Sequence, residues 1–213
     1  MDFSEKRKKL VASMQNSGVL KSSSVVNAFM NIPRENFFPK HQKDYAYADS
    51  AFSIGYGQTI SQPSTIAVML ELLDVQKGMK VLEVGSGCGY VLVLLKELAG
   101  KEGKVFGIEI VPELVSLAKE NLKNSGYEKI CVTYGNGQEG FPEEKNFDRI
   151  LISCACSEIS ANLKKSLAEN GKLVAPVGSF HTQFMHIVEK KNSEFEERTA
   201  YELGAFVFVP LKE

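Results

Sequence analysis

Short apolar runs alternate with amphipathic stretches from residue 80 onward. The apolar runs have the length of buried strands, and we expect strands at 80–84, 104–109, 129–134, 148–153 and 172–177. Helical spacing of the apolar positions between them predicts helices at 90–99, 112–124 and 159–168. Because strands that alternate with helices join into parallel sheets, the pattern predicts a doubly wound, mostly parallel α/β fold.

The part of the chain that precedes this alternation has a different pattern. Residues 3–17 and 22–33 show helical spacing and predict an N-terminal helical appendage packed on the core. Residues 33–63 contain many aromatic side chains without clear periodicity. Long irregular segments are commonly functional, and this aromatic content argues against disorder, so we expect an ordered loop. A further helix over 66–73 leads into the first strand.

The pattern changes again after Gly178. Two long runs, 183–190 and 195–209, predict a C-terminal antiparallel hairpin that closes the edge of the sheet. No repeat or linker interrupts the chain, so we expect a single domain over residues 1–213.

Composition excludes some classes of protein. A net charge of -1 over 213 residues argues against a protein dedicated to nucleic acid. No apolar run approaches the roughly 20 residues needed to span a bilayer, and residues 1–9 are charged, so we expect a cytoplasmic protein without membrane association. Cys154 and Cys156 are too closely spaced for a usual zinc pair, so no metal site is expected. We also expect a monomer.

Candidate chemistry is concentrated where the first strand ends. Val81–Tyr90 is an apolar run that ends in Gly85, Gly87 and Gly89 and then enters a helix. Glycines at such a turn let a ligand approach the backbone closely. The second strand ends in Glu109, where a carboxylate can accept hydrogen bonds from ribose hydroxyls. These features predict a nucleoside-type cofactor at the carboxyl ends of parallel strands.

The spacing of the glycines helps to choose the cofactor. Dinucleotide sites carry G-x-G-x-x-G, whereas this chain has G-x-G-x-G with Glu83 two residues ahead of the first glycine. A carboxylate beside the loop suits a cationic ligand better than a pyrophosphate. S-adenosyl-L-methionine has a sulfonium, an ammonium and a ribose but no phosphate, so it is the expected cofactor. The alternative is a glycine-rich turn without a ligand, which Glu83 and Glu109 make less favourable.

Several blocks of the chain resemble the protein-L-isoaspartate (D-aspartate) O-methyltransferase family over nearly the whole length. The most specific is G-x-G-Q-T-I-S-x-P at 55–63, because methyltransferases in general have no reason to carry it. The blocks lie at 32–39, 46–49, 54–63, 81–90, 175–178 and 208–211. The resemblance implies a Rossmann-like S-adenosylmethionine-dependent methyltransferase fold. In that fold 1–63 would hold the N-terminal helices and a loop covering substrate and cofactor, 64–178 the cofactor-binding core and 179–213 the hairpin.

The resemblance also implies a reaction. The enzyme would methylate the free carboxylate of L-isoaspartyl and D-aspartyl residues in damaged proteins, releasing S-adenosyl-L-homocysteine and initiating repair. A carboxylate is ionised at neutral pH, so no strong general base is required. The rate would come from positioning and desolvation. His41, His181 and His186 are accordingly interpreted as surface or packing residues.

Matching motif positions implies the site residues. Ser61 takes the place of the family's active-site serine, with the alternative that it only caps the helix starting near Pro63. Glu83 and the glycine-rich loop would line the methionine end, Glu109 would hold the ribose, and Asn136-Gly137 would lie at the adenine. The implied cofactor-binding residues are Thr59, Ile60, Ser61, Glu83, Gly85, Ser86, Gly87, Gly89, Glu109, Ile110, Asn136 and Gly137.

Three departures from the family pattern concern the same region. Asn136 stands where the family usually has Asp, Ser166 stands where Gln is common, and 154–160 replaces an alanine- and proline-rich segment. These changes are expected to line the substrate cleft, so a related methyltransferase with another carboxylate or small-molecule acceptor is the alternative enzyme. A third hypothesis is a non-catalytic domain that keeps the fold and binds a partner or the cofactor.

Overall fold

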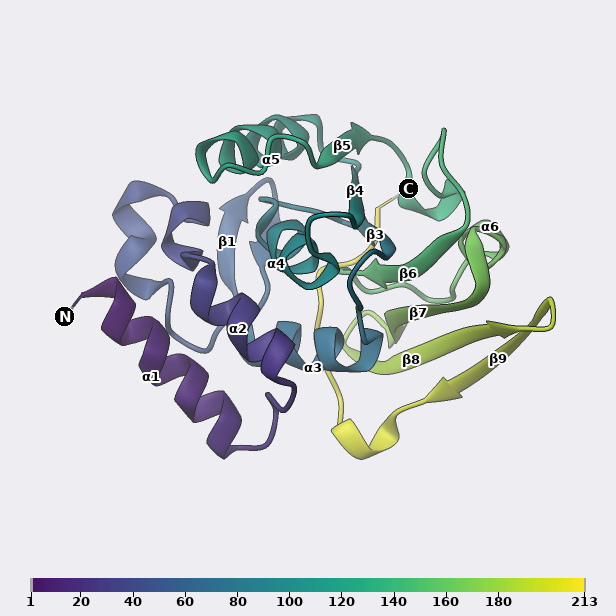
Figure 1. The fold of residues 1–213 in the computed structure, drawn as a ribbon, viewed down its shortest axis with the longest axis horizontal. Coiled ribbons are helices and arrows are strands. Elements are labelled where there is room, and N and C mark those ends of the chain that lie inside the picture. The colour runs from purple at the N-terminus through teal and green to yellow at the C-terminus, as the bar shows by residue number, and fades with distance from the viewer. Residues whose placement is uncertain (1, 213) are drawn as a thin grey trace.

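A computed structural model describes residues 2–212, which form a mostly parallel seven-stranded sheet with helices packed against it (Figure 1). The strand order is β5-β4-β3-β6-β7-β8-β9, parallel through β7 and antiparallel for the last two. The strands are β3 (Lys80–Val84), β4 (Lys104–Glu109), β5 (Cys131–Tyr134), β6 (Phe147–Ile152), β7 (Leu167–Ser179), β8 (Thr182–Lys191) and β9 (Glu194–Thr199). This arrangement confirms the fold class expected from the alternation of strands and helices.

The helices are distributed unequally over the two faces of the sheet. They are α1 (Phe3–Asn16), α2 (Ser23–Asn31), α3 (Pro63–Leu73), α4 (Tyr90–Ala99), α5 (Pro112–Asn124) and α6 (Ala161–Lys165). Helices α3, α4 and α5 pack on strands, α2 packs on α4, and α1 packs on α2, so one apolar core contains all five. The short α6 and apolar side chains of neighbouring loops join the core on the opposite face.

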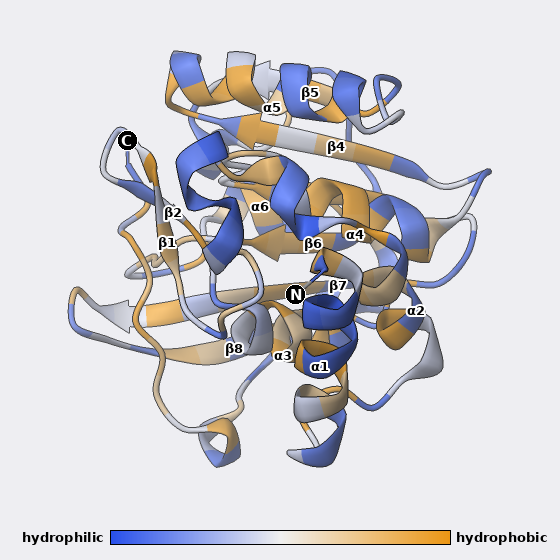
Figure 2. Cartoon of the chain, turned by 90° about the vertical axis from the view of Figure 1, so that its left-hand side faces the viewer, coloured by the Kyte–Doolittle hydropathy of each residue, from blue (hydrophilic) through white to orange (hydrophobic). Residues whose placement is uncertain are grey.

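Burial explains why the helical patterns differ. Helix α5 buries Leu114, Val115, Ala118 and Leu122, a single stripe facing the sheet, and Pro112 occupies its first turn. Helix α4 is apolar nearly all round because the sheet covers one side and α2 the other. Figure 2 shows hydrophilic and hydrophobic residues side by side along α1 and α5, as a helix with one solvent-exposed face requires.

Residues 33–63 are ordered by their aromatic side chains. Two 3₁₀ helices, Arg34–Phe37 and Lys40–Tyr45, precede an antiparallel hairpin of β1 (Phe52–Gly55) and β2 (Gln58–Ile60). The ring of Phe37 meets that of Tyr90 edge-on, with centroids 5.3 Å apart. The expectation of an ordered loop is therefore correct, although the short hairpin could not be read from the sequence.

Two of the expected elements need correction. The second strand of the predicted hairpin, 195–209, ends at Thr199 as β9, and the chain then turns through Tyr201–Leu203 and runs back as an irregular segment. We call residues 205–212 the return segment. Its Phe206 exchanges backbone hydrogen bonds with Gln183 of β8 (2.8 and 2.9 Å). The helix expected at 159–168 is shorter, because α6 ends at Lys165 and β7 already begins at Leu167.

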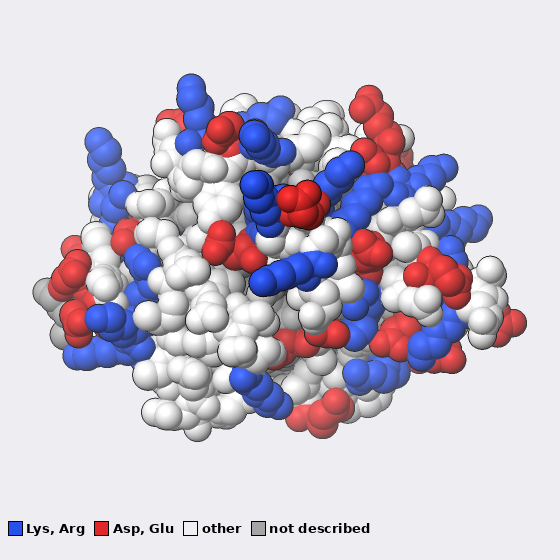
Figure 3. Space-filling model, viewed as in Figure 1, with Lys and Arg blue, Asp and Glu red and all other residues white. Residues whose placement is uncertain are grey.

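The surface carries both signs of charge. Figure 3 shows Lys and Arg side chains interspersed with Asp and Glu on the face that Figure 1 presents. No helix within residues 2–212 is both long enough and apolar enough to span a bilayer.

Candidate functional site

A narrow pocket lies at the carboxyl ends of β3, β4, β5 and β6, where the sequence placed a cofactor. It has a volume of about 40 Å³ and is bounded on one side by the return segment. Its lining residues are Gln58, Thr59, Val84, Gly85, Gly87, Ile108, Glu109, Ile110, Gly135, Gly137, Ser153, Cys154, Val209, Pro210, Leu211 and Lys212. We call this the cofactor pocket.

The glycine-rich loop shapes one wall of the cofactor pocket. Gly85, Gly87 and Gly89 all have positive φ, between 51° and 86°, which residues with a side chain rarely adopt. Across the pocket, a Cβ on Gly137 would lie 2.2 Å from Val84 Cγ1, so only glycine fits beside the end of β3. Gly85, Gly87 and Gly137 all line the pocket, so part of its wall is backbone that a ligand can approach closely.

Glu109, the last residue of β4, is held in a defined orientation. Its carboxylate accepts hydrogen bonds from the backbone N–H of Gly87 (2.9 Å) and of Val111 (3.0 Å). Each oxygen retains acceptor capacity after these bonds, since an ionised carboxylate has about four lone-pair sites. The side chain is buried at the pocket wall and is fixed where hydroxyl donors of a ligand can reach it.

Glu83 is buried behind the same wall. The hydroxyl of Ser153 donates to its Oε1 (2.7 Å), whereas no described residue donates to Oε2. Burial raises the pKa of Glu83 to about 8, and the nearby charge of Glu109 adds to the rise. The buried hydroxyl of Ser86 also has no partner among residues 2–212. Buried polar atoms of proteins are nearly always hydrogen-bonded, so two unpaired atoms at the end of β3 are an unusual feature beside the pocket.

A second and wider pocket of about 480 Å³ adjoins the first. Thr59 and Val209 line both pockets, so the two share a wall. We call the second the acceptor pocket. Its lining residues are Val19, Ala51, Thr59, Ser61, Gln62, Ser64, Thr65, Val68, Leu203, Ala205, Phe206, Val207, Phe208 and Val209.

Ser61 lines the acceptor pocket and does not cap the helix that follows. No side chain at the N-cap position caps α3, and the N–H of Ser64 is instead bound by Asp49 Oδ1 (2.9 Å). The helix-capping alternative for Ser61 is therefore wrong. Its backbone carbonyl accepts a hydrogen bond from Arg34 Nη2 (2.8 Å), which fixes the position of the residue.

The residues named from the sequence fall into two groups. Those that line the cofactor pocket are Thr59, Gly85, Gly87, Glu109, Ile110 and Gly137, and Ser61 lines the acceptor pocket. The others lie behind the wall: Ile60 is in the core, Glu83 and Ser86 are buried, and Gly89 is the N-cap residue of α4. The Asn136 side chain accepts from the N–H of Gln138 (2.9 Å) and so shapes the turn that carries Gly137.

Sequence reasoning missed the return segment and Ser153 as parts of the wall. The resemblance included 208–211, but the apolar run suggested a strand. The expectation that the whole of 154–160 lines the substrate cleft is wrong: Cys154 borders the cofactor pocket, Ala155 is hydrogen-bonded to the return segment, and Ser160 caps α6. Ser166 is buried, and its hydroxyl donates to Asn162 O (2.8 Å) within that helix region.

The remaining reactive side chains lie outside both pockets, with the exception of Cys154. His186 contacts Glu197 (2.9 Å) and Thr199 (3.2 Å) across the β8–β9 hairpin. Cys88, Cys154 and Cys156 are buried free thiols, and Cys131 is exposed. No group of His, Cys, Asp and Glu within residues 2–212 has the arrangement of a metal site.

Comparison with known proteins identifies the family. The family model for protein-L-isoaspartate (D-aspartate) O-methyltransferase matches residues 5–213. A protein-L-isoaspartate O-methyltransferase of Methanopyrus kandleri is 40% identical over 98% of this chain and 92% of its own length. A second, from Archaeoglobus fulgidus, is 41% identical over 100% of this chain and 95% of its own. A solved candidate protein-L-isoaspartate O-methyltransferase from Plasmodium falciparum, in complex with S-adenosyl-L-homocysteine, has a TM-score of 0.86 at 28% identity and covers 97% of this chain and 98% of its own. The chain therefore belongs to the protein-L-isoaspartate (D-aspartate) O-methyltransferase family.

Proposed function

We propose that this protein transfers a methyl group from S-adenosyl-L-methionine to the free carboxylate of L-isoaspartyl and D-aspartyl residues in damaged proteins, and that this ester formation initiates repair. The observation that carries the proposal is the shared wall of the two pockets, at Thr59 and Val209. A methyl donor in one pocket and a carboxylate in the other would meet at that wall. Family membership supplies the identity of both.

The cofactor pocket fits the chemistry of the donor. Glu109 presents carboxylate oxygens suited to the ribose hydroxyls, and the adenine would lie along Gly137, which lines the same pocket. The methionine end would lie along Gly85 and Gly87, which follow Glu83 at the end of β3. When bound, the donor supplies a methyl group activated by the positive sulfonium.

The return segment is the part of the wall suited to move for the nucleoside. The pocket of about 40 Å³ is smaller than the roughly 300 Å³ or more of usual ligand sites. Near the pocket the segment is held by two backbone hydrogen bonds to Ala155 (2.8 and 2.7 Å) and by Lys212 to Tyr56 O (3.5 Å). A small outward shift of 209–212 would enlarge the pocket without disturbing the sheet.

The acceptor side would bind and orient the substrate. The Ser61 hydroxyl would donate a hydrogen bond to one carboxylate oxygen and leave the other to attack the methyl carbon in line with the carbon–sulfur bond. The carboxylate is already ionised, so no side chain has to remove a proton, and the rate depends on alignment and exclusion of water. Thr59, at the wall of both pockets, lies where it can position both reactants.

Transfer of labelled methyl from S-adenosyl-L-methionine to two peptides that differ only in an aspartyl or isoaspartyl linkage tests the proposal. We expect base-labile label on the isoaspartyl peptide alone. Label on neither peptide, with cofactor binding intact, would contradict the proposal and favour a related methyltransferase with another acceptor. Absence of cofactor binding, measured as loss of thermal stabilisation, would contradict both enzyme functions, since a ligand that binds the native state must stabilise it.

A further inference from the structure

Arg34 is a buried cation without a carboxylate partner among the described residues. Its side chain is 1% exposed. Nε donates to the carbonyl of Ala46 (2.9 Å) and Nη2 to the carbonyl of Ser61 (2.8 Å), while Nη1 has no partner within residues 2–212. Burying a charge without a counter-ion is costly, so a residue that does so in this way invites a functional explanation.

Two aromatic rings hold the guanidinium in place. Its carbon lies 4.8 Å from the ring centroid of Tyr90 and 5.3 Å from that of Phe38. Desolvation lowers the pKa of Arg34 from its ordinary value, but an arginine begins so high that the group stays charged. The carbonyls and ring faces therefore replace the missing carboxylate.

The carboxylate of the neighbouring residue, Glu35, is bound by other side chains. Glu35 accepts from Arg7 Nη2 (3.4 Å) and from the hydroxyl of Tyr47. Arg7 in addition donates to the carbonyl of Met30 (2.9 Å) and so ties α1 to α2. Arg7 therefore forms the structural ion pair with Glu35. The role of Arg34 has to be inferred from the other contacts of its side chain.

Those contacts connect the two pockets. Tyr90 is the first residue of α4, directly after the last glycine of the cofactor loop. Ser61 lines the acceptor pocket. We propose that Arg34 is a positioning residue for methyl transfer, which holds the backbone of Ser61 at a fixed place relative to the glycine-rich loop. The inference rests on the proposed function, because it assumes that Ser61 faces the acceptor carboxylate.

The planar fork of arginine suits this task. Two donors on one rigid plane bind two carbonyls from Ala46 and Ser61 while both faces of the plane remain free for rings. A lysine would keep the charge but would present one flexible ammonium and would lose the stacking. Arg34→Lys therefore separates charge from geometry, and Arg34→Met removes both.

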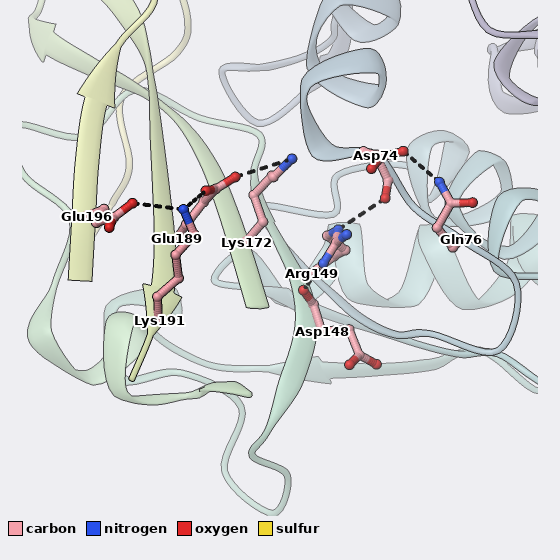
Figure 4. Close-up of polar contacts among 8 residues, drawn as sticks. All are labelled: Asp74, Gln76, Asp148, Arg149, Lys172, Glu189, Lys191 and Glu196. Carbon is pink, nitrogen blue, oxygen red and sulfur yellow. Dashed lines mark hydrogen bonds and ion pairs between the residues drawn. The ribbon is translucent and has the colours of Figure 1, made fainter. Parts of the chain in front are cut away.

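Arg149 offers a matched control within the same chain. It is also shielded from solvent, and it also donates to two backbone carbonyls, those of Asp74 (3.1 Å) and Asp148 (2.8 Å). It is the third residue of β6 and lines neither pocket. Figure 4 shows Arg149 beside Asp74 and Asp148. Arg149→Met thus removes a comparable guanidinium that lies outside both pockets.

The experiment compares wild type, Arg34→Met, Arg34→Lys and Arg149→Met at a temperature well below the unfolding transition of each. Titration with S-adenosyl-L-homocysteine gives its Kd and the fraction of protein that binds it, which we call competent sites. The rate of methylation of the isoaspartyl peptide, divided by the concentration of competent sites, then gives kcat per competent site. We expect Arg34→Met to lower kcat per site by about 100-fold with a change in Kd of less than about threefold, since a misplacement of about 1 Å can cost that much. Arg34→Lys should lose about tenfold or more, and Arg149→Met should keep the wild-type kcat per site.

Each alternative outcome has a definite meaning. A wild-type kcat per competent site in Arg34→Met would overturn the positioning role and leave a structural one. An equal loss of kcat and cofactor affinity would also overturn it, because the residue would then support the glycine-rich loop. If Arg34→Met does not fold, undiminished kcat in Arg34→Lys would refute the proposal by itself. Wild-type protein that fails to methylate the isoaspartyl peptide would refute the proposed function instead, so the two failures are distinguishable.

Discussion

The two ends of the parallel strands differ in how their polar side chains are satisfied. At the amino ends, charged groups pair with one another across β7, β8 and β9, as Figure 4 shows. Glu189 is bound by Lys172 (3.5 Å) and Lys191 (2.9 Å), and Lys191 also reaches Glu196 (2.8 Å). These charged groups bind one another and need no ligand as a partner.

At the carboxyl ends, by contrast, buried polar atoms lack partners. Four buried side-chain atoms of residues 2–212 have no hydrogen bond, and two of them, Glu83 Oε2 and Ser86 Oγ, lie at the end of β3. A third, Arg34 Nη1, belongs to the residue that connects Tyr90 to Ser61. The fourth, Ser125 Oγ, lies at the C-terminal end of α5 and lines neither pocket. Unpaired buried polar atoms destabilise a protein, so the two at the end of β3 are what a binding edge requires.

The largest effect on binding is expected from the carboxyl-end Glu109. In Glu109→Ala the ribose hydroxyls would lose their charge-assisted acceptor, worth about 1.5–3 kcal/mol, so the Kd for S-adenosyl-L-methionine should rise by about 10- to 100-fold. The same change also removes the acceptor for the N–H groups of Gly87 and Val111. Isothermal titration calorimetry measures the affinity, and Glu189→Gln at the amino ends serves as the control with unchanged Kd. If the Kd of Glu109→Ala stays within about threefold of wild type, Glu109 does not bind the ribose hydroxyls.

A more selective effect is expected from Ser61→Ala. Removing one hydrogen bond to the substrate carboxylate should lower kcat/KM by about 10- to 100-fold, because bonds to charged groups contribute about 1.5–3 kcal/mol. The Kd of the cofactor should change by less than about threefold, since Ser61 lines only the acceptor pocket. Steady-state methylation of the isoaspartyl peptide together with cofactor titration separates the two. Equal losses in kcat/KM and in cofactor affinity would mean that Ser61 supports cofactor binding and does not bind the acceptor carboxylate.

Much of this edge could be predicted from the sequence because its signals are local. The strands ending in Val84 and Glu109 and the helix after Pro112 have the expected bounds, since the periodicity, the glycines and the proline all act within a few residues. The position of Glu109 at the pocket follows from the strand alone. Local pattern and tertiary structure agree there.

The remainder depends on contacts between distant segments. The return segment has the apolar composition of a strand, but its partners are Gln183 of β8 and Ala155, which follows β6, and no periodicity reveals such pairing. The N–H of Ser64 is bound by Asp49, fifteen residues away, which is why a nearby serine was a reasonable capping alternative. Likewise nothing in the sequence around Arg34 shows that its guanidinium is buried.

Glu83 should give the carboxyl edge a distinctive dependence of stability on pH. Its pKa rises from 4.5 to about 8 on folding, mainly because of burial, so within that interval the unfolded chain has lost a proton that the native state keeps. The stabilising contribution of the neutral form is therefore lost as pH rises from 4.5 to about 8 and changes no further above it. The slope is at most about 1.4 kcal/mol per pH unit.

Denaturant unfolding of wild type and Glu83→Gln across that interval measures this contribution. The difference in unfolding free energy between the two reports Glu83 together with its electrostatic coupling to Glu109, Cys88 and Cys154, because the titrating groups that do not interact with Glu83 cancel. We expect wild type to lose stability relative to the variant as pH rises. A difference that stays constant would show that Glu83 is ionised in the native state.

The smallest effect, of opposite sign, is expected from Glu189 at the amino edge. Its hydrogen bond with Lys191 is the main cause of a lowered pKa, so its contribution is present above the ordinary value of 4.5 and is lost as pH falls through the lowered one. The group is about a third exposed, and solvent screening keeps the contribution below about 1 kcal/mol. Glu189→Gln should therefore reduce stability slightly at neutral pH, and less in high salt, because screening weakens exposed pairs. Denaturant unfolding at low and high ionic strength checks this, and a salt-independent loss of several kcal/mol would mean that the amino edge relies on this pair as heavily as the pockets rely on their buried groups.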